Sequence, residues 1–240
     1  SGPCAAALSI GGAKKSYAHT DPNEDGVVFV AGTGGFLVAV ADGHGGVEAS
    51  EAALEHVVAI AAQRFLAADS LLHGRWQDEA LALLAGANAS VLAQRARSGG
   101  RTHSRTTLAI AVARPDEGRC YTVSIGDSHV YQAQTSGAFD LACELSRSGE
   151  CFFLGVADET SETLFEKCVL ASESIAETRA LVVVTDGLSE RGVGVDDPDA
   201  TVAAAVLRAT ESPAETRALE TAPSIVEAAL AAHLRQPSGD

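Results

Sequence analysis

A short apolar segment that ends in a polar, glycine-rich turn most constrains the fold of this chain. Residues 36–41 are all apolar, and Asp42, Gly43 and His44 follow them directly. The shortness of the run and the glycines that flank it favour a buried strand. A carboxylate and an imidazole at the end of such a strand indicate either a polar loop or a site for a cation or a phosphate group.

Similar short apolar runs recur along the chain, and only a few helical patterns lie between them. The predicted strands are 5–10, 27–31, 36–41, 106–113, 120–125, 129–134, 164–170 and 181–185. Apolar residues at helical spacing predict helices around 54–65, 80–91 and 214–234, and Asp197 before Pro198 predicts the start of another. Because strands mostly follow strands, we expect an α+β fold with antiparallel sheets and helices outside them.

Composition limits the partners that this chain can have. With 17 basic and 32 acidic residues, the net charge of −15 argues against nucleic acid or an anionic membrane as partner. No apolar run approaches the roughly 18 to 20 residues of a membrane helix. The five cysteines show no C-x-x-C spacing, which is typical of reduced thiols in a cytoplasmic protein. No shift in composition marks a linker, so we expect a single domain over residues 1–240.

Acidic residues occur at several places where a predicted strand meets a glycine-containing turn. They are Glu24, Asp25, Asp42, Asp127 and Asp186. One Asp-Gly pair is a common turn signal, whereas several at the ends of strands of one sheet would gather carboxylates. Hard cations such as Mg²⁺ and Mn²⁺ bind oxygen ligands, and two such ions about 3.5 to 4 Å apart activate a water for attack on phosphorus. The pattern therefore predicts a two-metal hydrolytic site, with Asp127 in a hairpin between Val123 and Val130.

Other catalytic motifs are missing from the sequence. It contains no G-x-S-x-G, H-E-x-x-H or G-x-x-x-x-G-K pattern, and the glycine-rich residues 31–36 precede a strand, which predicts a hairpin turn. Of the histidines, only His44 falls in a candidate site. We expect His56, His73 and His233 to lie on the surface.

Five segments together resemble a known family. "NED" at 23–25, "ADGHGG" at 41–46, "TTLAIAV" at 106–112, "SIGDSHVY" at 124–131 and "VVVTDGL" at 182–188 occur in the order seen in metal-dependent serine/threonine protein phosphatases of type 2C. The resemblance implies a four-layer α-β-β-α sandwich, in which two antiparallel sheets are flanked by helices. It also implies two Mn²⁺ or Mg²⁺ ions, with a third at a weaker position.

The resemblance assigns roles to individual residues. The implied metal ligands are Glu24, Asp25, Asp42, the Gly43 carbonyl, Asp127, Asp186 and, at the end of the chain, Asp240. Asp42 would bridge the two ions, Glu24 and Asp25 would hold the second, and Asp127 would serve the third. His44 would protonate the leaving serine or threonine oxygen, which suits an imidazole; the alternative is a histidine that is merely hydrogen-bonded in a turn.

The chain departs from the family pattern at several positions. The family's phosphate-binding arginine is replaced by Thr20, so a bidentate charged contact is lost. Arg105 stands where a glycine is expected and either supplies that charge or is an ordinary exposed arginine. The segment from Tyr131 to Gly155 is short, and the Asn and the closing strand expected after Asp240 are missing from the sequence.

Three functions follow from these observations. The first is hydrolysis of phosphoserine and phosphothreonine in proteins by a monomeric signalling enzyme, with phosphorylated proteins as partners. The second is a weakly active or inactive regulatory or binding module, and the third is a phosphomonoesterase acting on small molecules. The retained carboxylates favour the first, because a binding module has no use for buried groups that repel one another.

Overall fold

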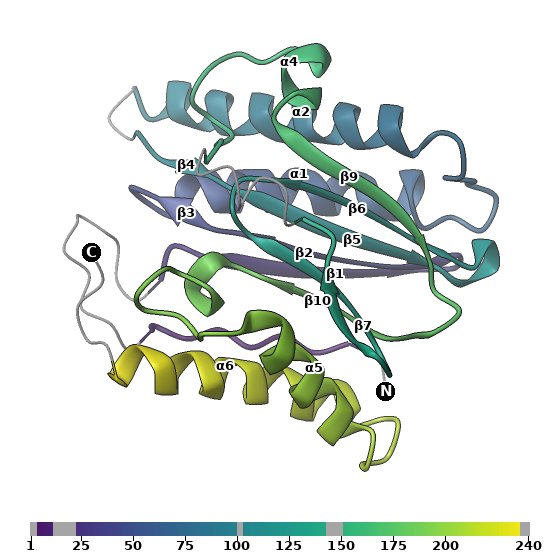
Figure 1. Cartoon of the computed structure of the whole chain (residues 1–240). Helices are drawn as coiled ribbons and strands as arrows, with labels where there is room; N and C mark the ends of the chain where they lie inside the picture. The colour runs from purple at the N-terminus through teal and green to yellow at the C-terminus, as the bar shows by residue number, and fades with distance from the viewer. Residues whose placement is uncertain (1–3, 12–22, 100–102, 143–150, 236–240) are drawn as a thin grey trace.

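A computed structural model of the chain describes residues 4–11, 23–99, 103–142 and 151–235. Figure 1 shows its layers, with one helical pair above two stacked sheets and a second pair below them. The order is therefore α-β-β-α, and both sheets are antiparallel. The predicted α+β sandwich is confirmed.

The larger sheet has five strands in the order β1-β2-β5-β6-β9. The strands are β1 (Gly26–Gly32), β2 (Gly35–Ala41), β5 (Leu108–Arg114), β6 (Arg119–Ile125) and β9 (Cys168–Ser174). β1 and β2 form a hairpin that closes on the pair Gly32 and Gly35, as predicted for residues 31–36. A Cβ atom on Gly35 would lie 2.0 Å from the carbonyl oxygen of Ala113, so this position requires glycine.

The smaller sheet has three strands in the order β10-β7-β8. They are β10 (Thr178–Val184), β7 (His129–Gln134) and β8 (Gly137–Asp140). A two-stranded ladder joins β3 (Gly43–His44) to β4 (Arg105–Thr106) at the end of the larger sheet.

The helices cover the outer faces of the sheets. They are α1 (Glu48–Arg64), α2 (Trp76–Arg97), α4 (Ser161–Phe165), α5 (Pro198–Ala209) and α6 (Arg217–Arg235). Two short 3₁₀ helices are η1 (Pro115–Glu117) and η2 (Asp186–Leu188). Asp197 caps α5 as predicted, because its Oδ1 accepts the N–H of Ala200 at 2.9 Å. Within the described residues, no helix is both long enough and apolar enough to cross a membrane.

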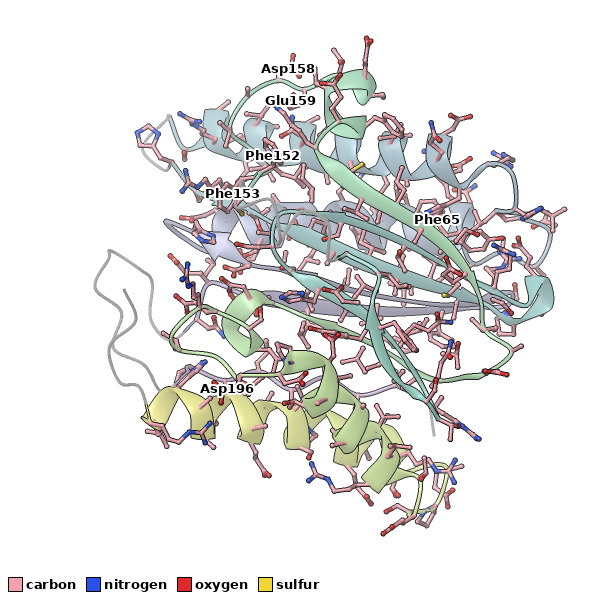
Figure 2. All side chains as sticks on the ribbon, in the orientation of Figure 1. Phe65, Phe152, Phe153, Asp158, Glu159 and Asp196 are labelled. Atoms are coloured by element: carbon pink, nitrogen blue, oxygen red, sulfur yellow. The ribbon has the colours of Figure 1, made fainter. Side chains whose placement is uncertain are left out.

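Three apolar clusters fill the spaces between the layers. The first lies under α1 and α2 and includes Phe65 (labelled in Figure 2) and Trp76. The second lies between β7, β10 and the pair α5 and α6, and includes Tyr131 and Ile225. The third lies between the sheets, around Ala109 and Val130. Burial on both faces explains why the predicted strands are continuous apolar runs.

Several predicted strands are wrong. Residues 5–10 form no strand in the described structure, because their extended backbone joins no hydrogen-bonded ladder there. The range 164–170 is divided between α4, whose N-cap Thr160 accepts the N–H of Thr163 at 3.3 Å, and β9. The range 106–113 is interrupted at Thr107, and β8 was not predicted.

Candidate metal centre and active site

Asp42 follows β2 and is held through its backbone. Its carbonyl accepts the N–H of Thr107 at 3.0 Å and the hydroxyl of Thr106 at 2.8 Å, and its own N–H donates to Thr107 Oγ1 at 3.1 Å. Thr107 Oγ1 also lies 2.9 Å from Ser128 Oγ, next to Asp127. The two threonines therefore fix Asp42 and Asp127 relative to each other, and the carboxylate of Asp42 is nearly buried.

Gly43 allows a close approach of two chain segments. A Cβ atom at this position would lie 2.4 Å from the carbonyl oxygen of Glu24. Ser50 Oγ donates to that same oxygen at 2.7 Å. Glu24 is buried, and its main-chain carbonyl lies against the turn that follows Asp42.

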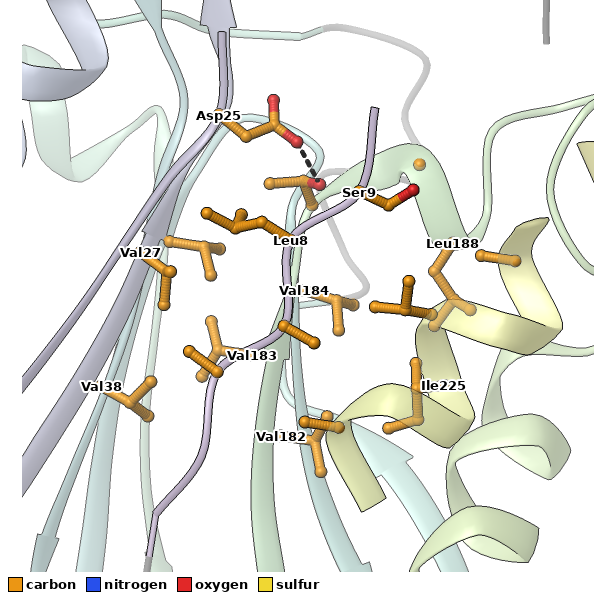
Figure 3. Close-up of a pocket in the computed structure, with 18 of the residues that line it drawn as sticks. Leu8, Ser9, Asp25, Val27, Val38, Val182, Val183, Val184, Leu188 and Ile225 are labelled. Carbon is orange, nitrogen blue, oxygen red and sulfur yellow. Dashed lines mark hydrogen bonds between the residues drawn. The ribbon is translucent and has the colours of Figure 1, made fainter. Parts of the chain in front are cut away.

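Asp25 and Asp186 meet across a long separation in sequence. Thr185 Oγ1 donates to Asp25 Oδ2 at 3.0 Å (Figure 3), which brings the end of β10 to the segment before β1. The N–H of Asp25 donates to Asn23 Oδ1 at 3.1 Å, a local turn contact. Asp186 opens η2, so its side chain starts a new turn directly after a strand.

Asp127 does not lie in a hairpin, and that prediction is wrong. β6 belongs to the five-stranded sheet and β7 to the three-stranded sheet, so Asp127 lies on the connection between the sheets. Gly126 has φ +102°, and a Cβ atom there would lie 2.5 Å from Thr107 Cγ2. Among the described residues, the buried Oδ1 atom of Asp127 has no hydrogen-bond partner. Such an orphaned acceptor is what a bound cation would satisfy.

His44 and Arg105 face each other across the β3–β4 ladder. His44 Nδ1 lies 3.4 Å from Asp42 Oδ1. The His44 ring meets Phe153 edge-on at 4.8 Å between centroids, and the Arg105 guanidinium carbon lies 4.3 Å from the centre of the same ring. Phe153, labelled in Figure 2, thus contacts both side chains at the edge of the carboxylate group.

The carboxylates affect one another strongly. Burial, followed by the charges of Asp186 and Asp25, raises the pKa of Asp42. Burial and then the charge of Asp127 raise the pKa of Asp186, and the side chains of Asp42 and Asp186 share a hydrogen bond. Burial and then Asp127 likewise raise the pKa of the Cys151 thiol. A cation bound here would remove this repulsion, because an opposite charge favours the ionised carboxylates.

Comparison with known proteins identifies this constellation. A family model described as Protein phosphatase 2C matches residues 14–235. The chain belongs to the protein phosphatase 2C family. No curated protein sequence matches it.

Solved structures of bacterial phosphatases share the fold of this 2C-family chain. The serine/threonine phosphatase Stp1 from Staphylococcus aureus is 16% identical, with a TM-score of 0.68 over 92% of this chain and 89% of that chain. The Mycobacterium tuberculosis phosphatase PstP/Ppp is 22% identical, with a TM-score of 0.62 over 95% and 92%. The catalytic domain of PstP in complex with two manganese ions has the same identity and coverage and a TM-score of 0.60. At these identities the similarity shows the fold alone.

The acidic residues of this 2C-family chain offer the oxygen donors that a hard cation prefers. Their side chains in the described structure are not arranged as a complete ligand set. Glu24, Asp25, Asp42, Asp127 and Asp186 offer only oxygen donors, and Asp127 Oδ1 is an orphaned acceptor. In the part of the chain that the structure describes, no three His, Cys, Asp or Glu side chains are arranged to hold an ion. Two positions singled out in the sequence, Thr20 and Asp240, lie outside the described residues.

Two histidines beside the carboxylates were not predicted to belong to the site. His129 Nδ1 lies 2.7 Å from Asp140 Oδ2, and its Nε2 lies 2.5 Å from Ser189 Oγ. His233, predicted on the surface, is 8% exposed and contacts the Gly187 carbonyl through Nε2 at 2.7 Å. The prediction for His233 is wrong because the apolar side of α6 carries it toward η2. The position of His129 directly after "GDS" was the only local signal for its role.

A cavity of about 920 Å³ opens beside the site. Figure 3 shows Val27 and Val38 on one side of it, Val182 of β10 and Ile225 of α6 on the other, and Leu8 between them. Its lining continues to Asp25, Asp42 and Asp186 and to His44 and Arg105. The candidate site is therefore the polar end of a largely apolar cavity.

Proposed function

We propose that this protein hydrolyses phosphoserine and phosphothreonine in protein substrates by means of a metal-activated water. The observation that carries this proposal is the group of buried carboxylates at the ends of β2 and β10, whose pKa values are raised by burial and by the charges of neighbouring carboxylates. Such mutual repulsion destabilises the folded chain unless a carboxylate is protonated or a cation is bound. The membership in the 2C family supports the same chemistry.

The proposed cofactors are two Mn²⁺ or Mg²⁺ ions and a third at a weaker position. Asp42 would serve both main ions and the Gly43 carbonyl one of them. Asp186 would hold the first, Glu24 and Asp25 the second, and Asp127 the third. We propose Asp240 as a further ligand. Ions of this kind, when bound, supply the charge that activates a water for attack on phosphorus.

His44 and Arg105 would act on the substrate. His44 lies beside Asp42 and is partly exposed, so it can donate a proton to the leaving oxygen. Arg105 lies on β4, opposite His44 on β3, and its guanidinium is held over the Phe153 ring. This places the guanidinium next to His44, where it can bind the phosphate group. In this proposal, Arg105 would supply the charge that Thr20 lacks, and its role would be substrate binding.

The biological setting follows from this activity. We propose a monomeric signalling enzyme of the cytoplasm that removes phosphate from phosphorylated proteins and opposes a kinase. The four cysteines in the described residues are free thiols, which suits a reducing compartment.

The test is phosphate release from a phosphothreonine peptide as Mn²⁺ is titrated, with Asp42→Asn in parallel. We expect turnover that rises with Mn²⁺. The variant should lose more than the roughly 10- to 100-fold that an outer-shell contact contributes. No turnover at any Mn²⁺ concentration would indicate a binding module. Release from a small phosphomonoester but not from the peptide would indicate a phosphatase of small molecules.

A further inference from the structure

Three side chains from three segments form a continuous hydrogen-bonded row beside the acidic site. They are Asp140 at the end of β8, His129 at the start of β7 and Ser189 directly after η2. The two contacts of the His129 ring measure 2.7 Å to Asp140 and 2.5 Å to Ser189. His129 is 7% exposed, so water scarcely competes for these contacts.

Asp140 fixes the His129 ring from behind. Its Oδ1 accepts the N–H groups of Ala142 at 2.9 Å and Val130 at 3.3 Å, so the carboxylate itself cannot turn. A carboxylate only accepts, so the ring nitrogen that faces it carries a proton. The ring also stacks on Tyr131, with centroids 5.7 Å apart and planes 22° apart. His129 is thus held in one orientation with Nε2 toward Ser189.

The row ends on the turn that carries Asp186. Ser189 Oγ lies 3.3 Å from the Asp186 carbonyl, which also accepts the N–H groups of Ser189 at 2.7 Å and Glu190 at 2.6 Å. His233, on α6, contacts the Gly187 carbonyl of the same turn. The turn is therefore braced by one histidine from β7 and one from α6.

The order serine, histidine, aspartate is also that of a nucleophilic triad. Such a site needs backbone N–H groups free to hold an oxyanion. Here the N–H groups of Ser189 and Glu190 both donate to the Asp186 carbonyl. The geometry therefore favours a brace over a second catalytic centre.

We propose that His129, anchored by Asp140, is a positioning residue that fixes the Asp186 turn through Ser189 and so sets the affinity for divalent cations. This inference rests on the proposed function, because it takes Asp186 as a cation ligand. A ligand held in place loses less freedom when an ion binds, and loss of an outer-shell contact lowers metal affinity about 10- to 100-fold.

The experiment measures Mn²⁺ binding to the full chain from the electron paramagnetic resonance signal of free Mn²⁺. Ser189→Ala and His129→Gln should each weaken binding about 10- to 100-fold, and Ser189→Thr, which keeps the hydroxyl, should restore it. The double variant should be no weaker than the worse single variant, because both remove one row. Unchanged affinity in both single variants would overturn the proposal.

Gln132→Ala serves as the matched control. Gln132 is buried on the same strand, and its Nε2 donates to the Ser174 carbonyl and to Thr178 Oγ1, both at 2.7 Å, away from the acidic site. We expect it to lower thermal stability while Mn²⁺ affinity stays within about twofold, since it touches no ligand. An equal loss of Mn²⁺ affinity in this control would overturn the proposal in favour of general destabilisation.

Two further measurements separate this inference from the proposed function. If the wild-type chain does not bind Mn²⁺, the proposed function fails. Amide hydrogen exchange of the metal-free protein then tests whether His129 fixes the Asp186 turn. Exchange at Ser189 and Glu190 should be faster in His129→Gln than in wild type, and equal exchange would overturn the proposal. Covalent labelling of Ser189 by a fluorophosphonate would overturn it as well, because it would show a nucleophile.

Discussion

The strands β5 and β6 carry a buried charged cluster at each end, and the two clusters differ in their balance of charge. At one end, Arg114 is fully buried and lies 3.4 Å from Glu117, with Nη1 donating to the Phe65 carbonyl at 2.7 Å. Tyr121 Oη donates to Glu117 at 2.6 Å. At the other end, the pKa values of Asp42 and Asp186 are raised by burial and by other carboxylates.

The difference separates a structural cluster from a functional one. The Arg114 cluster pairs opposite charges: Arg114 Nε lies 3.4 Å from Glu117 Oε1, and both side chains make hydrogen bonds to other groups, while Arg114 Nε and Nη2 have no hydrogen-bond partner among the described residues. Each charge therefore has an opposite charge beside it without any added group. The aspartate cluster joins like charges, so it is stabilised only by protonation or by a cation. Both clusters are buried and polar. Whether the charges in a cluster are opposite or alike determines whether the cluster favours binding of a cation.

The largest expected effect breaks the balanced cluster. Arg114→Met leaves Glu117 buried without its cation, so we expect a loss of about 3 to 5 kcal/mol of unfolding free energy in urea denaturation. Arg75→Ala is the matched control, because Arg75 pairs with Glu79 while its side chain is 63% exposed. That variant should lose no more than about 1 kcal/mol. Equal losses in both variants would contradict the contrast.

The second prediction concerns the acidic cluster and metal. Mn²⁺ at 100 times its dissociation constant should raise the unfolding free energy of wild type by about 2.7 kcal/mol. Asp186→Asn should lose most of this gain, yet without metal it should be at least as stable as wild type, because one repelling carboxylate is gone. Thermal unfolding with and without Mn²⁺ measures both. A metal-free variant that is clearly less stable would refute the repulsion.

The third prediction is a pH dependence at the balanced cluster. Burial alone would raise the pKa of Glu117, but hydrogen bonds from Tyr121 and two backbone N–H groups, together with Arg114, lower it. A lowered pKa means that this stabilisation is complete above the ordinary pKa and is lost as pH falls through the folded-state value. Glu117→Gln should therefore be less stable by about 2 kcal/mol at neutral pH.

The stability gap between wild type and Glu117→Gln should close in acid, as measured by urea denaturation at a series of pH values. The aspartate cluster should behave in the opposite way. Because the pKa of Asp42 is raised, metal-free wild type should lose stability relative to Asp42→Asn as pH rises above the ordinary pKa of an aspartate. If the stability of wild type relative to its variant changed with pH in the same direction in both comparisons, the difference between the two clusters would be refuted.

The smallest predicted effect concerns Phe153, which lies at the rim of the acidic cluster. Phe153→Leu keeps the apolar volume but removes the ring face under Arg105, a contact of about 0.5 to 1 kcal/mol at an exposed site. We expect KM for a phosphopeptide to rise about 2- to 5-fold with kcat nearly unchanged. A fall in kcat without a change in KM would indicate that Phe153 acts by positioning His44 instead of Arg105.

The sequence by itself determined the elements whose signals are local. The apolar run at 129–134 coincides with β7, and the pair Asp197 and Pro198 gives the start of α5. The order of strands and helices was sufficient for an α+β fold with antiparallel sheets, and the resemblance to the 2C phosphatases supplied the four-layer sandwich. The inventory of acidic residues beside glycines also came from local pattern, because turn chemistry depends on neighbouring residues alone.

Only the tertiary structure decided which of these elements meet. Thr185 Oγ1 lies 3.0 Å from Asp25 Oδ2, although the two residues are 160 positions apart in the sequence. Asp127 lies on the connection between two sheets, where the local pattern predicted a hairpin. His129 joins Ser189, a residue 60 positions away, and His233 turns inward on α6. The pairing of distant strands and the burial of a helix face are set by the packing of layers. A local stretch of sequence does not contain such contacts. The acidic residues could therefore be singled out from the sequence, whereas the contacts of His129 and His233 could not.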